Sequence, residues 1–144
     1  MYNRYGLQLD CVMNERDLGV IIDSKLLWSI HCEMILQKAT KQFNLLRRTC
    51  YFIYDSRQKR ALYPTLVRNI LKHCCQVWSP QNSTYLDLFG KLQKRAVKWI
   101  MKKQHESYSD SVYLQKQKEF DILSVKYRLL FSDLLLFFKI VNKD

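Results

Sequence analysis

Five basic residues recur between positions 91 and 102 at spacings of three and four, and residues of this kind bind phosphate. They are Lys91, Lys94, Arg95, Lys98 and Lys102. At about 100° per residue, a helix over 83–103 carries them on one arc. Beside it lies an apolar arc of Tyr85, Leu88, Leu92, Ala96 and Trp99. The apolar arc can enter a core, while the basic arc can either meet phosphates or remain a solvated surface.

The net charge of +11 is concentrated in the middle of the chain. Residues 27–104 hold fifteen basic and three acidic side chains, whereas residues 1–26 carry a net −1 and residues 105–144 carry none. Concentrated positive charge favours a polyanionic partner, and we expect Lys38, Lys41 and Arg48 to contribute to the same interface. A membrane surface would attract the same charge, but the longest apolar run, 129–141, is too short to span a bilayer. Charge alone does not choose between these two partners; our prediction is nucleic acid, and no membrane.

The sequence contains no recognisable catalytic constellation. Its three glycines are scattered, so there is no glycine-rich phosphate loop. It has no adjacent aspartates to hold two metal ions, and its three histidines lie in separate segments. His73, Cys74 and Cys75 could suggest a metal site, but adjacent cysteines on a helix point about 100° apart and are better explained as buried apolar residues. We expect no enzyme activity, no cofactor, no metal and no small-molecule substrate.

The elements that would position these residues are mainly helical. Glycine and proline are scarce, which predicts long helices near 28–50, 56–76, 83–103 and 125–142, with a shorter one over 112–120. Alternation over 5–13 and the apolar run 18–22 predict two strands joined by a polar turn at 14–17. The expected fold is therefore a mainly α helical bundle of about four principal helices with a short N-terminal β-hairpin.

Local signals predict where these helices begin and break. Pro64 removes a backbone donor, so the second helix should kink or break near Tyr63. The residues expected to cap helices are Ser24 or Ser29, Asp55, Asn82 or Ser83, and Ser124. The last helix is apolar beyond one stripe, which predicts that it is clamped between other helices or docked on a missing partner.

Five cysteines with no C-x-x-C pair and no visible signal peptide indicate free thiols in a reducing compartment. We therefore expect an intracellular protein, nuclear or cytoplasmic, and not a secreted one.

Several short blocks, in this order and spacing, resemble a region of non-LTR (LINE, jockey-like) retrotransposon reverse transcriptases. The first block is Asp-Leu-Gly-Val-Ile-Ile-Asp at 17–23, and the longest is Leu-Gln-Lys-Arg-Ala-Val-Lys-Trp-Ile at 92–100. The others lie at 38–41, 46–48, 62–63, 66–68, 77–80 and 138–140.

The resemblance implies a non-catalytic fragment from the C-terminal side of an RNA-directed DNA polymerase. Residues 1–26 would be a β-hairpin at the end of the palm, and residues 27–104 would form a basic helical thumb that grips the template–primer backbone. Residues 105–144 would be connecting helices, and the three regions together would form one compact unit. The missing palm, which carries the catalytic aspartates in that family, would be a further partner. Two other readings remain open: an independent nucleic-acid-binding module, and a stand-alone helical interaction or structural domain that docks through 129–141.

Overall fold

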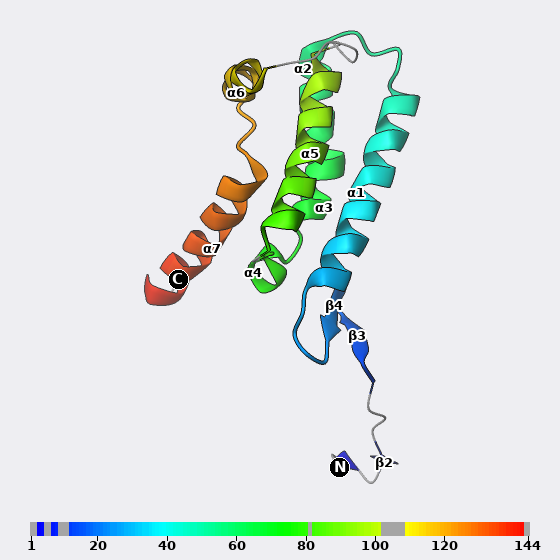
Figure 1. Cartoon of the computed structure of the whole chain (residues 1–144), viewed down its shortest axis with the longest axis vertical. Helices are drawn as coiled ribbons and strands as arrows, with labels where there is room; N and C mark the ends of the chain where they lie inside the picture. Colours follow the sequence, from blue (N-terminus) through cyan, green and yellow to red (C-terminus); the bar gives the residue numbers. More distant parts are fainter. Residues whose placement is uncertain (1–2, 5–6, 9–11, 81, 102–108, 143–144) are drawn as a thin grey trace.

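The computed structural model describes residues 3–4, 7–8, 12–80, 82–101 and 109–142, and its body is a bundle of helices (Figure 1). The mainly α fold with a short N-terminal β-hairpin is confirmed. In chain order the elements are β1 (Asn3–Arg4), β2 (Leu7–Gln8), β3 (Asn14–Asp17), β4 (Val20–Asp23), α1 (Ser29–Thr49), α2 (Ser56–Tyr63), the π-helical turn η1 (Pro64–Arg68), α3 (Asn69–Lys72), α4 (Cys75–Trp78), α5 (Ser83–Ile100), α6 (Asp110–Glu119) and α7 (Val125–Asn142).

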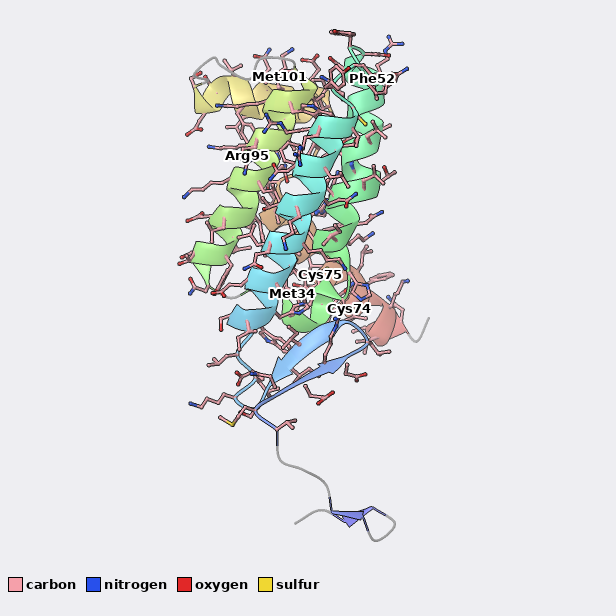
Figure 2. The ribbon with its side chains drawn as sticks, turned by 90° about the vertical axis from the view of Figure 1, so that its right-hand side faces the viewer. Met34, Phe52, Cys74, Cys75, Arg95 and Met101 are labelled. Atoms are coloured by element: carbon pink, nitrogen blue, oxygen red, sulfur yellow. The ribbon has the colours of Figure 1, made fainter. Side chains whose placement is uncertain are left out.

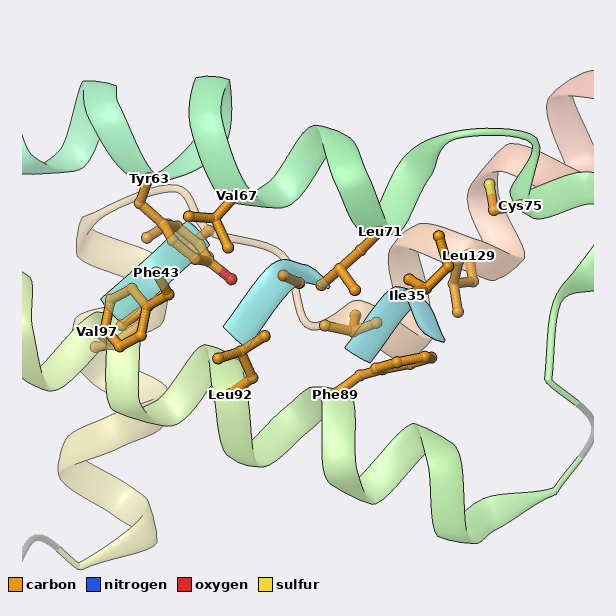
Figure 3. Packing of buried hydrophobic residues seen from close by; sticks show 14 of the residues in the cluster. Ile35, Phe43, Tyr63, Val67, Leu71, Cys75, Phe89, Leu92, Val97 and Leu129 are labelled. Atoms are coloured by element: carbon orange, nitrogen blue, oxygen red, sulfur yellow. The ribbon is translucent and has the colours of Figure 1, made fainter. Parts of the chain in front are cut away.

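The core lies between α1, the α2–η1–α3 segment and α5, and α7 adds a fourth side (Figures 1 and 3). Phe43 of α1, Tyr63 at the end of α2 and Phe89 of α5 are among its fully buried side chains. Burying one large apolar side chain contributes about 1.5–3 kcal/mol, so these stripes, rather than helix propensity, hold the helices together.

The second helix is interrupted at Pro64, as predicted. Regular α-helix ends at Tyr63, and the next five residues form the π-helical turn η1. The proline ring has no N–H to donate to the carbonyl four residues earlier. In the same turn the Thr65 hydroxyl donates to the carbonyls of Ala61 and Leu62, both at 3.0 Å. The segment then ends near Cys74, whose φ of 51° lies in the left-handed region.

Three of the predicted helix caps are confirmed, and the first is wrong. Asp55 and Asn82 each accept from the backbone N–H two residues later, at 2.9 Å. Ser124 accepts from the N–H three residues later, at 3.3 Å. Helix α1, however, starts with Trp28 in the capping position and no side-chain hydrogen bond there. Neither Ser24 nor Ser29 caps it.

The N-terminal hairpin is built from other residues than the predicted strands 5–13 and 18–22. The segment Asn14–Asp17, expected as a turn, is strand β3, and it pairs antiparallel with β4. The turn is Leu18–Gly19, whose φ values of 47° and 87° suit a tight two-residue hairpin connection. All four residues of β3 are exposed, so no apolar alternation marks this strand. β1 and β2 form a separate small hairpin beyond it (Figure 1).

Hairpin β3–β4 docks on the helices through two histidines. His31 of α1 is buried, and its Nδ1 accepts from the backbone N–H of Ile21 at 3.1 Å. Burial, with His73 and Arg16 nearby, lowers the pKa of His31 below 6.5. His73 lies with its Nε2 3.1 Å from the carbonyl oxygen of Leu18 in the turn. The hairpin is therefore fixed to the bundle by polar contacts as well as by buried Val20.

Helix α7 is not clamped between other helices. Its first two turns bury Val125, Arg128, Leu129 and Ser132. From Leu134 to the end of α7, every large apolar side chain is exposed. Among the described residues, no helix is both long enough and apolar enough to cross a bilayer.

Candidate nucleic-acid interface

On α5, the basic residues lie on the side of the helix opposite the core, whereas the sequence had placed them next to the apolar arc. The buried residues of α5 are Phe89, Leu92, Gln93, Ala96, Val97, Trp99 and Ile100. At about 100° per residue, this set is centred nearly opposite Lys91 and Lys98. Tyr85 and Leu88, which the sequence placed in the apolar face, are only partly buried. The face of α5 that is buried is therefore rotated around the helix axis relative to the predicted apolar arc.

Helices α1 and α5 run side by side in the same direction (Figures 1 and 2). The Arg95 Nη2 donates to Oδ1 of Asn44 at 3.5 Å, and Tyr85 Oη donates to Oε1 of Glu33 at 3.1 Å. From one contact to the other the chain advances eleven residues on α1 and ten on α5, which only parallel helices allow. The guanidinium of Arg95 also lies 5.9 Å from the ring centre of buried Phe43.

This packing gathers basic side chains of both helices on one surface. On α1, Lys41 and Arg48 lie within about 60° of Asn44. On α5, Lys91 and Lys98 lie within about 60° of Arg95. Lys98 is partly buried and the other four are exposed. We call these five residues the α1–α5 basic surface: Lys41, Arg48, Lys91, Arg95 and Lys98.

The parallel register also sets their heights along the bundle. Asn44 is level with Arg95, so each residue of α1 is level with the residue about fifty-one positions later. Arg48 is thus level with the end of α5 near Lys98, and Lys41 is level with the turn that carries Lys91. Each helix adds about 1.5 Å per residue, so the two pairs are separated by about 10 Å along the axis.

Three other predicted residues are not part of this surface. Lys94 lies about 100° from Arg95, where its Nζ pairs with Asp110 of α6 at 2.7 Å and sits 5.3 Å from the ring centre of Tyr113. The Lys94 ammonium in turn holds the pKa of Asp110 below its ordinary value. Lys38 lies about 120° from Asn44, on another flank of α1. Lys102 lies outside the described residues.

The structure adds residues that sequence reasoning missed. A shallow hollow at the C-terminal end of α1 is lined by Asn44, Arg47, Arg48 and Tyr51. The guanidinium of Arg47 lies 5.9 Å from the ring centre of Phe43, as that of Arg95 does. The two arginines are 48 positions apart in the sequence but lie at the same aromatic ring, a proximity that no local pattern reveals.

One basic residue of the middle segment is withdrawn from solvent. Lys59 is only 6% exposed. Its Nζ donates to the carbonyl oxygen of Trp99 at 3.4 Å and lies 5.0 Å from the centre of that indole ring. Lys59 therefore joins α2 to α5 and does not contribute to a phosphate-binding surface.

Four of the five cysteines lie in the part of the chain that the structure describes, and all four are free thiols. Among the described residues, no group of three or more potential protein ligands is close enough to hold a metal ion. Cys75 is fully buried, as expected for a small apolar residue, and burial raises its pKa. Burial also raises the pKa of Cys32 to about 11. Both groups are therefore thiols at neutral pH and poor nucleophiles.

Comparisons with models of protein families, with curated proteins and with solved structures found no match to this chain.

Proposed function

We propose that this chain is a non-catalytic C-terminal part of an RNA-directed DNA polymerase of a non-LTR retrotransposon, and that it holds template–primer nucleic acid by its phosphates. The observation that carries the proposal is the parallel packing of α1 on α5 through Asn44 and Arg95. It brings five cations onto one surface. The ordered sequence blocks supply the assignment to a polymerase.

The chemistry of this surface favours backbone contacts over base recognition. Three of its five members are lysines, whose ammonium groups act as point charges on flexible stems. Such contacts fix the position of a duplex but carry no sequence information. The expected affinity is weak, about 10 µM at physiological salt, and independent of sequence.

The proposal assigns no catalytic step to this chain. The sequence has no adjacent pair of acidic residues like the aspartate pair that holds the metal ions of a polymerase palm. The purified protein should not extend a primer with Mg²⁺ or Mn²⁺, and primer extension by homogeneous protein would contradict the proposal. The palm that supplies the catalytic aspartates would be a partner.

The test is the salt dependence of binding to a short DNA duplex or RNA–DNA hybrid, measured by fluorescence anisotropy. If each of the five residues neutralises one phosphate, log K should fall with log salt at a slope of about −4.5 on DNA. Replacing Lys41, Arg48 and Lys91 together by Ala should flatten that slope by about 2.7.

A matched control removes the same charge elsewhere. Lys118, Lys126 and Lys139 are exposed and belong to α6 and α7. Their triple Ala variant should keep the wild-type slope. Equal losses in both triple variants would mean that the charge acts only as a diffuse field, and the α1–α5 basic surface would lose its role.

A second candidate function, a helical protein-interaction domain with no nucleic-acid role, is favoured by α7. Its exposed apolar side chains include Leu134, Phe137, Phe138 and Ile140. Contiguous exposed apolar surface is typical of protein interfaces. Absence of any nucleic-acid binding at low salt would favour this second function.

A further inference from the structure

Three aromatic side chains protrude from the loop that joins α1 to α2. Tyr51, Phe52 and Tyr54 are 75%, 59% and 72% exposed. Single exposed apolar residues are common, but three aromatic rings within four positions of a short loop are not needed to build this core. The exposed rings of Tyr51 and Phe52 are therefore accessible to a partner that takes up aromatic surface.

The rings of Tyr51 and Phe52 are arranged edge to face. Their centres are 5.8 Å apart and their planes are inclined by 88°. In that geometry the ring that contributes its edge keeps both faces clear of the other ring. A flat partner can therefore stack on this pair without separating it.

The same loop lies beside guanidinium groups. Tyr51 lines the hollow at the end of α1 together with Asn44, Arg47 and Arg48. Asn44 is also the residue that holds Arg95, so the hollow continues into the α1–α5 basic surface. Figure 2 shows Phe52 at the same end of the bundle as Met101, where α1 and α5 both end. The basic surface thus leads toward an aromatic loop.

We infer that the α1–α2 loop binds unpaired bases, so that the protein prefers a duplex that continues into a single strand over a blunt duplex. A nucleotide combines an anionic phosphate with a flat base. The arginines of the hollow can bind the phosphate, and the ring of Tyr51 can stack on the base. Paired bases inside a duplex cannot reach Tyr51 or Phe52, whereas the bases of a single strand can. Every base has a π-face, so the preference is for strandedness and not for sequence.

This inference rests on the proposed function, because the duplex contacts the α1–α5 basic surface while the overhang contacts the loop. The two are separable by experiment. Charge substitutions change the salt slope on blunt and overhanging duplexes alike, whereas aromatic substitutions carry no charge. The aromatic substitutions therefore change only the ratio of the affinity for the overhanging duplex to the affinity for the blunt duplex.

The test compares a blunt duplex with the same duplex carrying an oligothymidine overhang, by fluorescence anisotropy with the full chain. The variant is Tyr51→Ala with Phe52→Ala, and its matched control is Tyr127→Ala with Phe131→Ala, two exposed aromatic residues of α7. Unchanged urea denaturation midpoints establish that both variants are folded. Wild type and control should prefer the overhang by about tenfold or more, and the loop variant should lose that preference while binding the blunt duplex unchanged.

A second readout reports stacking itself. A 2-aminopurine placed in the overhang should lose fluorescence on binding wild-type protein and keep it on binding the loop variant. An overhang preference that survives in the loop variant overturns the inference and leaves the proposed function intact, whereas absence of binding to both substrates overturns both. Competition by a polyglutamate peptide that depends on Tyr51 and Phe52 would assign the loop to acidic peptides and also overturn the inference.

Discussion

Replacing Asp110 by Asn should strengthen nucleic-acid binding, because it frees the positive charge of Lys94. The Asp110 carboxylate lies 2.7 Å from Nζ of Lys94, and that contact lowers the pKa of Asp110, so the carboxylate is ionised at neutral pH. The pair therefore presents almost no net charge to a phosphate. Asn keeps the shape and the hydrogen-bond acceptor of Asp and removes the negative charge.

The magnitude follows from the number of neutralised phosphates. One additional phosphate contact steepens the dependence of log K on log salt by about 0.9. The slope should thus change from about −4.5 in the wild type to about −5.4 in Asp110→Asn. Over the fourfold change from about 50 to 200 mM salt, that difference corresponds to about 3.5-fold in affinity.

The control makes the same charge change on the same helix. Glu119 pairs with Lys116 on α6, and Glu119→Gln frees a lysine that belongs to α6 rather than to α1 or α5. Anisotropy titrations on a blunt duplex over that salt range should give a steeper slope of log K against log salt for Asp110→Asn and an unchanged slope for Glu119→Gln. Equal changes in the two variants would refute the reasoning. The reasoning would also fail if Lys94→Ala flattened the wild-type slope as much as Lys91→Ala does. Lys94 would then contact phosphate despite its pairing with Asp110.

Three further predictions concern stability and association. Gly19→Ala should cost about 1–2 kcal/mol in urea denaturation because φ is +87° there, whereas Gly90→Ala, in open space on α5, should gain about 0.5–1 kcal/mol. Because the pKa of His31 is lowered in the folded state, the unfolded chain binds more protons just below pH 6.5, so stability should fall as pH drops through 6.5. His31→Asn, which retains an acceptor for the Ile21 N–H, should weaken that dependence in denaturation at several pH values. The exposed apolar face of α7 should cause concentration-dependent self-association, which Phe137→Glu should reduce in sedimentation velocity, and a monodisperse wild-type monomer at high concentration would contradict this.

The long helices were predictable because their apolar residues recur at the three- and four-residue spacing of an α-helix. Along the first long helix, apolar residues recur at helical spacing at Trp28, Cys32, Ile35, Ala39, Phe43, Leu46 and Cys50. The middle five are buried, and Trp28 and Cys50 at the two ends are partly buried. The break at Pro64 and the cap at Asp55 were also predictable, because both depend on one residue and its immediate neighbours. Local chemistry decides such features, so the sequence contains them in readable form.

The features that were missed depend on what packs from elsewhere. Helix α5 contacts α1 on one side and α6 and α7 on another, and this double contact buries Gln93 and Val97, which a single-stripe reading leaves outside. Gln93 is buried because its Nε2 donates to the carbonyl oxygen of Leu123 at 3.1 Å. Strand β3 was missed for the opposite reason: all four of its residues are exposed, so no pattern marked it.

The interface itself shows why a count of charges does not locate a binding surface. Residues 27–104 carry fifteen basic side chains, but the fold assigns them to different environments. Lys59 is buried against Trp99, and Lys94 is neutralised by a carboxylate sixteen residues later. Arg95 contacts Asn44 of α1 and stays exposed, and the parallel packing of the two helices aligns their cations. A solvated basic face would need no such alignment, because hydration does not depend on the relative register of two helices. Phosphates on a rigid duplex do depend on it, so the register between α1 and α5 is the property that the charge substitutions must probe.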